Sequence, residues 1–197
     1  METPKLHTTI HDRSGLKLPA RSSDDEINGS ELMSVARAGA KYLGKWPSRR
    51  TAPFNSKWLY RVHREMFGDV WRWAGQRRQS ETNIGLPPTQ IEEAIENLVQ
   101  DLAIWDGEII QDAAELHFQA VRIHPFKDGN GRWARLVTNI WLMQKRRPIV
   151  SWPEPQMRQM DSDIRKRYNQ AIVARENGNP DLLVELHRRF TGFPTVS

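Results

Sequence analysis

Residues 124–135 are His-Pro-Phe-Lys-Asp-Gly-Asn-Gly-Arg-Trp-Ala-Arg, and the other segments of the chain are best placed relative to this loop. Upstream, residues 110–123 carry apolar side chains on one broad helical face. Pro125 ends that helix, because the residue before a proline is disfavoured in the α region. Downstream, residues 132–144 predict a second helix that starts after a glycine-rich turn. The sequence therefore predicts two helices joined by a loop that gathers the charged residues.

The turn Gly129-Asn130-Gly131 has the properties of a phosphate site. Main-chain N–H groups at a helix start have no helical partner, glycine lets phosphate oxygens approach closely, and the helix dipole favours anions there. Arg132 and Arg135 are three residues apart on the same helical face, so they are predicted to clamp a polyphosphate. The side-chain amide of Asn130 is predicted to orient the phosphates.

Two further residues of the loop complete a candidate catalytic set. His124 is the candidate general base, because an imidazole titrates near neutrality and accepts a hydroxyl proton. Asp128 offers a hard oxygen ligand for Mg²⁺ held jointly with phosphates. A glycine-capped turn with incidental charges would explain each residue taken singly. Base, metal ligand and anion site together favour nucleotidyl transfer.

The motif matches every specified position of H-P-F-x-[D/E]-G-N-G-R-x-x-R, the signature of Fic-domain proteins. The segment 63–70, followed by Trp73-Ala74-Gly75 and Arg78, is similar to the part of that family that precedes its active-site flap. The resemblance covers roughly residues 55–190. It implies transfer of AMP from ATP to a Ser, Thr or Tyr hydroxyl of a target protein, with pyrophosphate leaving and Mg²⁺ required. Ser14-Gly15-Leu16-Lys17 resembles the subgroup called mobile mystery protein B.

The segment 76–85 is predicted to form a short β-hairpin, because turn formers lie at both of its ends. The resemblance implies that it is the flap that holds the target by main-chain pairing, a form of strand addition. The residues assigned to this role are Thr82, Asn83, Ile84 and Gly85. An ordinary surface loop is the alternative interpretation.

Restraint of the activity is a second implication of the resemblance. In many Fic-domain proteins a helix with [S/T]-x-x-x-E-[G/N] places its glutamate against the second motif arginine, here Arg135. This chain has no complete copy, and Glu26, Glu96 and Glu176 lie only in near-matches. We therefore expect the chain to be active without mutation, and any inhibitor protein to act in trans, as in a toxin–antitoxin pair.

Two rival functions stay open at this point. Phosphoryl or phosphocholine transfer would use the same histidine, but Gly131 before Arg132 matches the adenylylating pattern, whereas the phosphorylating branch has lysine there. A catalytically silent nucleic-acid-binding module is less favoured because the base, the acid and both arginines are present. Nucleic acid is not expected as the substrate.

Composition limits the class of protein. The chain has 197 residues, enough for one domain with a sizeable core, a net charge of +5 and no cysteine. No apolar run approaches the roughly 18 residues of a spanning helix. The absence of cysteine fits a reducing compartment, so we expect a cytoplasmic protein without membrane attachment. The basic excess is modest and spread out, with local runs at Arg49-Arg50, 145–147 and Arg188-Arg189, and a solvated basic surface explains it as well as a nucleic-acid site does.

The rest of the chain predicts an all-α helical bundle with one small β-hairpin flap. An irregular arm is expected over 1–29, a catalytic domain over 30–191 and a tail over 192–197. Ser30 is expected to cap the first helix and Asn55 the second. Capping boxes are predicted at Thr89 with Glu92 and at Ser151 with Glu154. His63 and His117 lie on apolar helical faces and are interpreted as structural residues.

Overall fold

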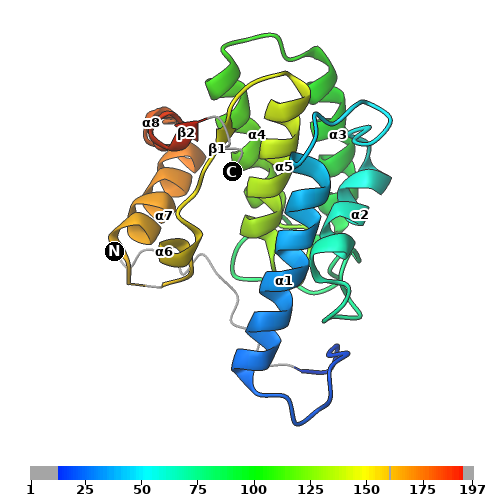
Figure 1. Cartoon of the computed structure of the whole chain (residues 1–197). Helices are drawn as coiled ribbons and strands as arrows, with labels where there is room; N and C mark the ends of the chain where they lie inside the picture. The colour runs from blue at the N-terminus through cyan, green and yellow to red at the C-terminus, as the bar shows by residue number, and fades with distance from the viewer. Residues whose placement is uncertain (1–12, 160, 193–197) are drawn as a thin grey trace.

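The computed structural model describes residues 13–159 and 161–192, and within them the chain forms eight α-helices (Figure 1). The helices are α1 (Asp24–Leu43), α2 (Ser56–Phe67), α3 (Ile91–Ile104), α4 (Ile109–Ile123), α5 (Asn130–Gln144), α6 (Glu154–Arg158), α7 (Asp163–Glu176) and α8 (Asp181–Phe190). A 3-10 turn, η1 (Pro88–Gln90), precedes α3, and the strands are β1 (Ile149–Val150) and β2 (Thr191–Gly192). The predicted all-α class is confirmed, and the described residues contain one small two-stranded sheet.

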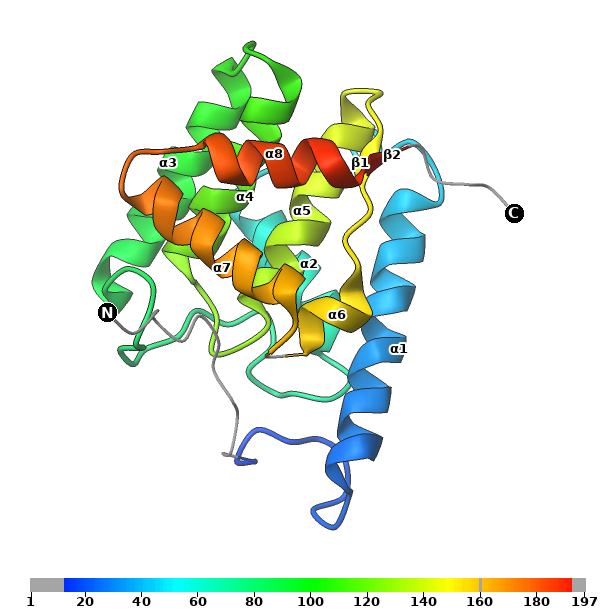
Figure 2. The ribbon, with the colours of Figure 1, turned by 90° about the vertical axis from the view of Figure 1, so that its left-hand side faces the viewer.

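Helix α5 is the central element of the fold. It packs against α4, α1 and α2, with α6, α7 and α8 on one side and α3 on the other (Figures 1 and 2). All of its residues are buried except Gly131, Arg132 and Gln144, which are intermediate. The helix is apolar nearly all round, as a fully enclosed helix must be. Packing therefore fixes its N-terminal end, where the motif lies.

The helices that flank the motif confirm the expected boundaries closely. Helix α4 ends at Ile123, directly before the motif histidine, and α5 begins at Asn130, two residues earlier than predicted. Asn55 caps α2 as predicted, because its Oδ1 accepts the Trp58 N–H at 2.9 Å. The local sequence signals next to the motif were sufficient here.

The first helix begins earlier than expected. Ser23, not Ser30, is its N-cap, and Ser23 and Glu26 form a complete capping box. Residues 24–29 are therefore helical rather than part of an irregular arm. Leu16 of the arm is buried and bridges to Trp71, which fastens this part of the chain to the segment after α2. The predictions for residues 1–12 and for the tail after Gly192 lie outside the described residues.

Two predicted capping boxes are wrong. Helix α3 follows the turn η1, and no side chain caps it, so Thr89 does not act as an N-cap. Ser151 does not cap a long helix either, since α6 has only five residues and no side-chain cap, and α7 starts after Ser162. The physical reason at the second site is that Glu154 bonds an arginine of α5 instead of a main-chain N–H.

The strands lie in a different place from the predicted hairpin. β1 and β2 pair antiparallel, with Val150 opposite Thr191, whereas residues 76–85 contain no strand. Main-chain carbonyls of that loop, at Ser80 and Leu86, accept hydrogen bonds from the Arg78 guanidinium. The loop thus folds around a buried cation rather than pairing with itself.

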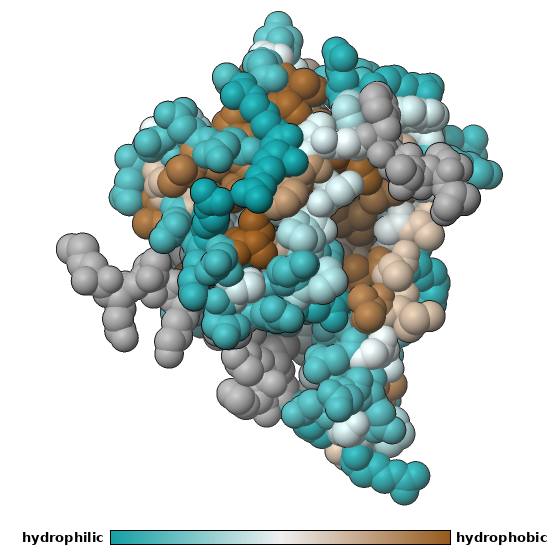
Figure 3. Space-filling view, turned by 60° about the vertical axis from the view of Figure 1, so that its left-hand side comes forward, coloured by the Kyte–Doolittle hydropathy of each residue, from teal (hydrophilic) through white to brown (hydrophobic). Residues whose placement is uncertain are grey.

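The surface is mainly hydrophilic, with apolar residues visible in patches among the polar ones on the face in Figure 3. Five large apolar side chains are exposed among the described residues, and Trp46 is the aromatic one. No helix formed by residues 13–159 and 161–192 is long and apolar enough to cross a membrane.

Candidate active site

His124 occupies an unusual backbone position between α4 and the motif loop. Its φ of 51° and ψ of 57° are in the left-handed region, where non-glycine residues are uncommon. The residue is 5% exposed, yet neither ring nitrogen has a hydrogen-bond partner. The main chain of Val121 comes close enough to influence the ring without forming a bond of normal geometry. An imidazole without partners is free to accept a proton from a bound group.

Burial, together with the nearby positive charge of Arg78, lowers the pKa of His124 to about 4. The imidazole is therefore neutral at neutral pH. Neutrality is the state that a general base needs, because only the neutral ring has a lone pair to take a proton. The predicted role of His124 stays a prediction, but its environment suits it.

The motif loop is fastened by the side chain of Asn130. Its Oδ1 accepts the Phe126 N–H at 2.9 Å, and its Nδ2 donates to the Phe126 carbonyl at 2.8 Å. Both amide atoms thus bond the main chain and hold the loop, and the expectation that this amide orients phosphates stays a prediction. Gly129 is required by shape, because its φ is +79° and a Cβ there would meet the Phe67 ring at 2.6 Å.

His63 braces the loop from α2. Its Nδ1 accepts the Gly75 N–H at 3.0 Å, so its Nε2 carries the proton and donates to the Asp128 carbonyl at 2.9 Å. The ring also stacks on Phe126, with centroids 3.6 Å apart. Burial lowers the pKa of His63 to about 3. Its interpretation as a structural residue is confirmed, and its specific task is to join the flap segment to the motif.

Arg132, the first motif arginine, lies between two carboxylates. Its Nη1 is 2.6 Å from Glu31 of α1, and its Nη2 is 3.2 Å from Asp128. The guanidinium lies over the Phe67 ring, 4.5 Å from its centroid. Glu31 is buried and also accepts the Trp71 indole N–H. These contacts hold the arginine at the start of α5, where phosphate oxygens are predicted to bind.

Arg135, the second motif arginine, is more deeply buried and is paired within the chain. Its Nε and Nη2 donate to the two carboxylate oxygens of Glu154 at 2.7 and 2.8 Å, a bidentate pair. The Tyr168 hydroxyl also lies near the guanidinium and favours its charged form. Burial alone would lower the pKa of Arg135, but Glu154 and Tyr168 outweigh it and raise that pKa.

The sequence did not predict this pair, because only the glutamates in near-matches of the restraint motif were considered. Glu154 has Val150 four residues before it, so it lies outside the [S/T]-x-x-x-E-[G/N] pattern. Two of the three near-match glutamates have structural contacts, as expected. Glu26 belongs to the capping box of α1, and Glu176 forms an exposed ion pair with Arg122 at 3.4 Å.

A chain of buried hydrogen bonds extends from Tyr168, beside Arg135, to α8. His187 Nδ1 lies 2.8 Å from the Leu183 carbonyl and must donate to it, so its Nε2 accepts from His117 Nδ1 at 3.2 Å. His117 Nε2 then accepts the Tyr168 O–H at 3.0 Å. Every donor in the chain has one acceptor. His117 is thus a structural residue, as predicted.

The flap segment covers His124 and is fastened to it by Arg78. The Nε of this buried arginine donates to the His124 carbonyl at 2.7 Å, and its main-chain N–H donates to the Pro125 carbonyl at 2.9 Å. Gly85 has φ +97°, and a Cβ there would meet the His124 Cβ at 2.4 Å. Two of the predicted site regions, the flap and the motif, therefore meet at the histidine.

Asp128 is half-buried beside Arg132, and it is the motif's single carboxylate. Among the described residues no group of three or more His, Cys, Asp or Glu side chains is arranged to hold a metal ion. Mg²⁺ is commonly bound by one or two carboxylates together with substrate phosphates. A single aspartate next to a predicted phosphate site fits that mode of Mg²⁺ binding.

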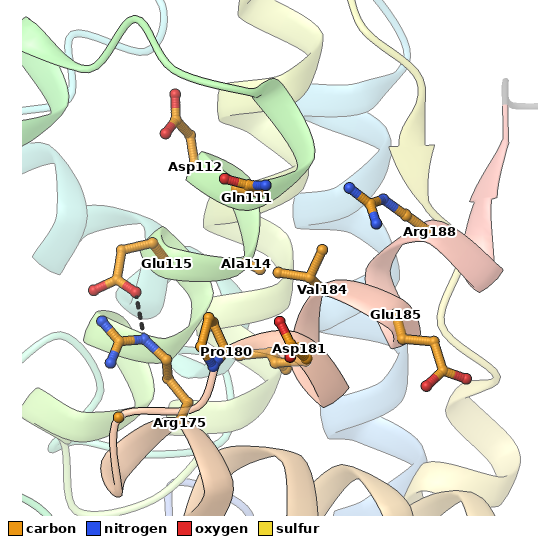
Figure 4. Close-up of a pocket in the computed structure, with 12 residues that line it drawn as sticks. Gln111, Asp112, Ala114, Glu115, Arg175, Pro180, Asp181, Val184, Glu185 and Arg188 are labelled. Atoms are coloured by element: carbon orange, nitrogen blue, oxygen red, sulfur yellow. Dashed lines mark hydrogen bonds and ion pairs between the residues drawn. The ribbon is translucent and has the colours of Figure 1, made fainter.

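Four residues of the site were not identified from the sequence: Glu31, Glu154 and Tyr168, and Arg78 in its bonding role. No local signal identifies the first three, because each reaches the motif from another helix. A separate pocket of about 720 Å³ lies between α4 and the α7–α8 turn (Figure 4). The Glu115–Arg175 ion pair lies in its wall, at 2.8 Å, and no motif residue lines it.

Residues 53–142 match the model of the Fic/DOC family. Among curated proteins, the chain is 28% identical over 148 residues to the protein adenylyltransferase VbhT of Bartonella schoenbuchensis, covering 69% of this chain and 29% of that protein. It is 32% identical over 134 residues to the protein adenylyltransferase Fic of Nematostella vectensis, covering 63% of this chain and 31% of that one. The chain thus spans less than a third of the length of these relatives.

Solved structures with the same fold include the N-terminal FIC domain of Bep8 protein from Bartonella sp. 1-1C. The TM-score is 0.70 at 15% identity, covering 100% of this chain and 99% of that one. The BepC protein of Bartonella tribocorum with bound AMPPNP gives a TM-score of 0.68 at 15% identity, covering 95% and 100%. At these identities the likeness concerns the fold.

Proposed function

We propose, from the match of residues 53–142 to the model of the Fic/DOC family, that the chain is a protein adenylyltransferase. It transfers AMP from ATP to a Ser, Thr or Tyr hydroxyl of a target protein. The observation that carries the proposal is His124, a buried neutral imidazole without hydrogen bonds beside a glycine-rich helix start. The curated relatives named protein adenylyltransferases support the transferred group.

The chemical step is a displacement at the α-phosphorus of ATP. A ring nitrogen of His124 takes the hydroxyl proton as the target oxygen bonds to that phosphorus, and the bond to pyrophosphate breaks. The free N–H groups at the start of α5, including those of Asn130 and Gly131, stabilise the negative charge of the phosphates. Arg132 binds the outer phosphates, and Arg135 contributes positive charge from the next turn.

Mg²⁺ is proposed as the metal, with Asp128 as its protein ligand. Bound there with the phosphates, the ion would neutralise charge as pyrophosphate departs. The carboxylate is 3.2 Å from Arg132, so both groups face the same phosphate site. A reaction that consumes ATP also supports the proposed cytoplasmic location.

The flap is proposed to hold the target segment. Residues 82–85 are adjacent to the base, since Gly85 packs directly on His124. An extended target chain that pairs with the main chain of this loop would present its hydroxyl to the ring. The loop has no strand partner within its own span, which supports strand addition by a substrate.

An inhibitor in trans is also proposed, within a toxin–antitoxin pair, but Glu154 constrains how it acts. A glutamate presented to Arg135 by another protein would have to displace Glu154, which already forms both hydrogen bonds of a bidentate pair. The phosphates of ATP would also compete with the Glu154 carboxylate for Arg135.

Label transfer tests the proposal. The purified chain is incubated in a cell lysate with Mg²⁺ and with ATP labelled at either the α- or the γ-phosphate. We expect label on protein only from α-labelled ATP. Transfer of the γ label would identify a kinase instead, and label from neither would contradict nucleotide-dependent transfer.

A further inference from the structure

Two of the basic runs, far apart in the sequence, meet at one end of the fold. One is in the loop between α1 and α2, and the other follows α5. Gln144 at the end of α5 donates to the Ala52 carbonyl at 2.9 Å, which joins the two segments. The Arg146 guanidinium lies over the Trp46 ring, 5.0 Å from its centroid. Figures 1 and 2 show the end of α5 and the loop after α1 at the same end of the molecule.

This basic end consists of Lys45, Arg49, Arg50, Lys145, Arg146 and Arg147. All six side chains are exposed, and none has a carboxylate within 4.0 Å among the described residues. The charge of Lys145 acts on the Asp112 carboxylate, but the two side chains do not form an ion pair. The whole chain has a net charge of +5, so without these six cations it would carry a charge of −1. Six of the 29 basic residues of the chain therefore lie together at this end.

The helix dipole explains only part of this surface. Lys45 and Lys145 each follow the end of a helix, where a cation is favourable. Arg49 and Arg50 do not, because the next element is the N-terminal end of α2. Arg146 adopts a φ of +60°, a conformation that non-glycine residues rarely take, while its guanidinium stacks on Trp46. Trp46 is nevertheless 45% exposed.

The basic end is separate from the candidate active site. The motif lies at the start of α5 and the basic end at its finish, which puts about 22 Å between them for a helix of fifteen residues. None of its residues contacts His124, Asp128 or the motif arginines. A ligand here acts independently of the proposed adenylyl transfer.

We propose that the basic end binds a single-stranded nucleic acid. Its phosphates would contact the arginines and lysines, and an unpaired base would stack on Trp46 beside Arg146. Unpaired cations attract a polyanion by releasing its condensed counterions. An exposed indole next to them favours a single strand, since stacking needs a base that is not already paired in a duplex.

The test uses the full chain and a fluorescent oligothymidylate of about 20 nucleotides, with binding followed by anisotropy. Because single strands lose affinity with a slope near −0.7 per phosphate contact, four contacts predict about a 50-fold loss between roughly 50 and 200 mM salt. Arg49→Gln, Arg50→Gln, Arg146→Gln and Arg147→Gln together should weaken binding at least about tenfold and flatten this slope. Trp46→Ala should weaken it about tenfold, and Trp46→Phe much less.

Arg188→Gln with Arg189→Gln is the matched control, because this third basic run lies on α8, outside the basic end. It should leave binding unchanged, and all of these variants should keep their melting temperature and their label transfer. No binding at low salt, or equal loss in the control, would overturn the proposal. Tighter binding of duplex DNA or of phosphatidylserine vesicles, without dependence on Trp46, would overturn the single-stranded assignment.

Discussion

His124 and the His117–His187 pair are both buried, but their ring nitrogens are treated in opposite ways. In the pair, and in the chain that continues to Tyr168, every nitrogen has a partner between 2.8 and 3.2 Å. At His124 neither nitrogen has one. Buried polar atoms are normally hydrogen-bonded, and leaving them unpaired costs stability. The difference separates a group that holds the fold together from a group that is free to react.

Removal of His124 should give the largest effect. His124→Ala removes the proton acceptor, and general-base assistance is worth roughly 10²–10⁴-fold in rate. We expect label transfer from α-labelled ATP to fall by at least this lower bound, with the helical circular dichroism unchanged. His124→Asn is the second variant, because asparagine tolerates the left-handed backbone at this position. A variant with more than a tenth of the wild-type rate would show that another residue is the base.

Asp128→Ala separates the proposed metal ligand from the base. Raised Mg²⁺ should restore part of its lost activity, because the phosphates still supply ligands for the ion. No such recovery should occur in His124→Ala. If both variants respond alike to Mg²⁺, the two roles are wrongly assigned.

Breaking the paired region should change stability rather than chemistry. His187→Leu leaves His117 Nδ1–H without an acceptor, and a buried unsatisfied donor costs about 1–3 kcal/mol of unfolding free energy. Adding His117→Leu removes that donor but leaves the Tyr168 O–H without its acceptor, so one unsatisfied donor remains and the double variant should lose less than twice as much. Urea unfolding measures both. The result that contradicts this view is loss of label transfer without any loss of stability.

Acid should act on both regions alike, because burial is the shared cause. It lowers the pKa of His124 and of His187 to about 4, below the usual 6.5. As pH falls, both histidines bind protons in the unfolded chain before they do so in the folded one. The stability that depends on their neutral rings is therefore complete above pH 6.5 and is lost towards pH 4. Each group contributes a slope of up to about 1.4 kcal/mol per pH unit. Unfolding free energies between pH 7 and 5 should therefore fall less steeply in His187→Leu and in His124→Ala.

The motif loop was predictable because all of its candidate catalytic residues lie within twelve successive positions. The position of α5, its burial and the capping of α2 by Asn55 followed from local patterns in the same way. The pattern Ser-x-x-Glu shows where local reasoning stops. At Ser23–Glu26 it forms a capping box, but at Ser151–Glu154 the glutamate bonds Arg135 instead.

Contacts between distant helices account for the other differences. The Arg132–Glu31 pair joins residues 101 positions apart, so no spacing rule identifies it. The flap was expected to pair with itself, but a buried Arg78 collects its carbonyls. A cation that needs three main-chain acceptors outweighs the weak strand preference of a short polar segment.

Glu154 bonds Arg135, which lies between the histidine chain and the motif loop. Its replacement should give the smallest effect that we predict. Arg135 is bonded to Glu154 and lies beside Tyr168, the last member of the histidine chain. Glu154→Gln removes the negative charge but keeps an acceptor for the guanidinium. Phosphates then meet an unneutralised Arg135, so we expect ATP affinity and label transfer to rise several-fold.

The same substitution should lower the melting temperature without ATP, because Arg135 stays buried beside a neutral partner. ATP should therefore raise the melting temperature of Glu154→Gln more than that of the wild type, since a ligand stabilises in proportion to its affinity. Glu26→Gly and Glu176→Gly are the controls, because neither glutamate contacts Arg135. A gain of label transfer in either control would locate the restraint elsewhere. An unchanged ATP response in Glu154→Gln would mean that Arg135 does not contact the phosphates, and that the histidine chain ends at a purely structural arginine.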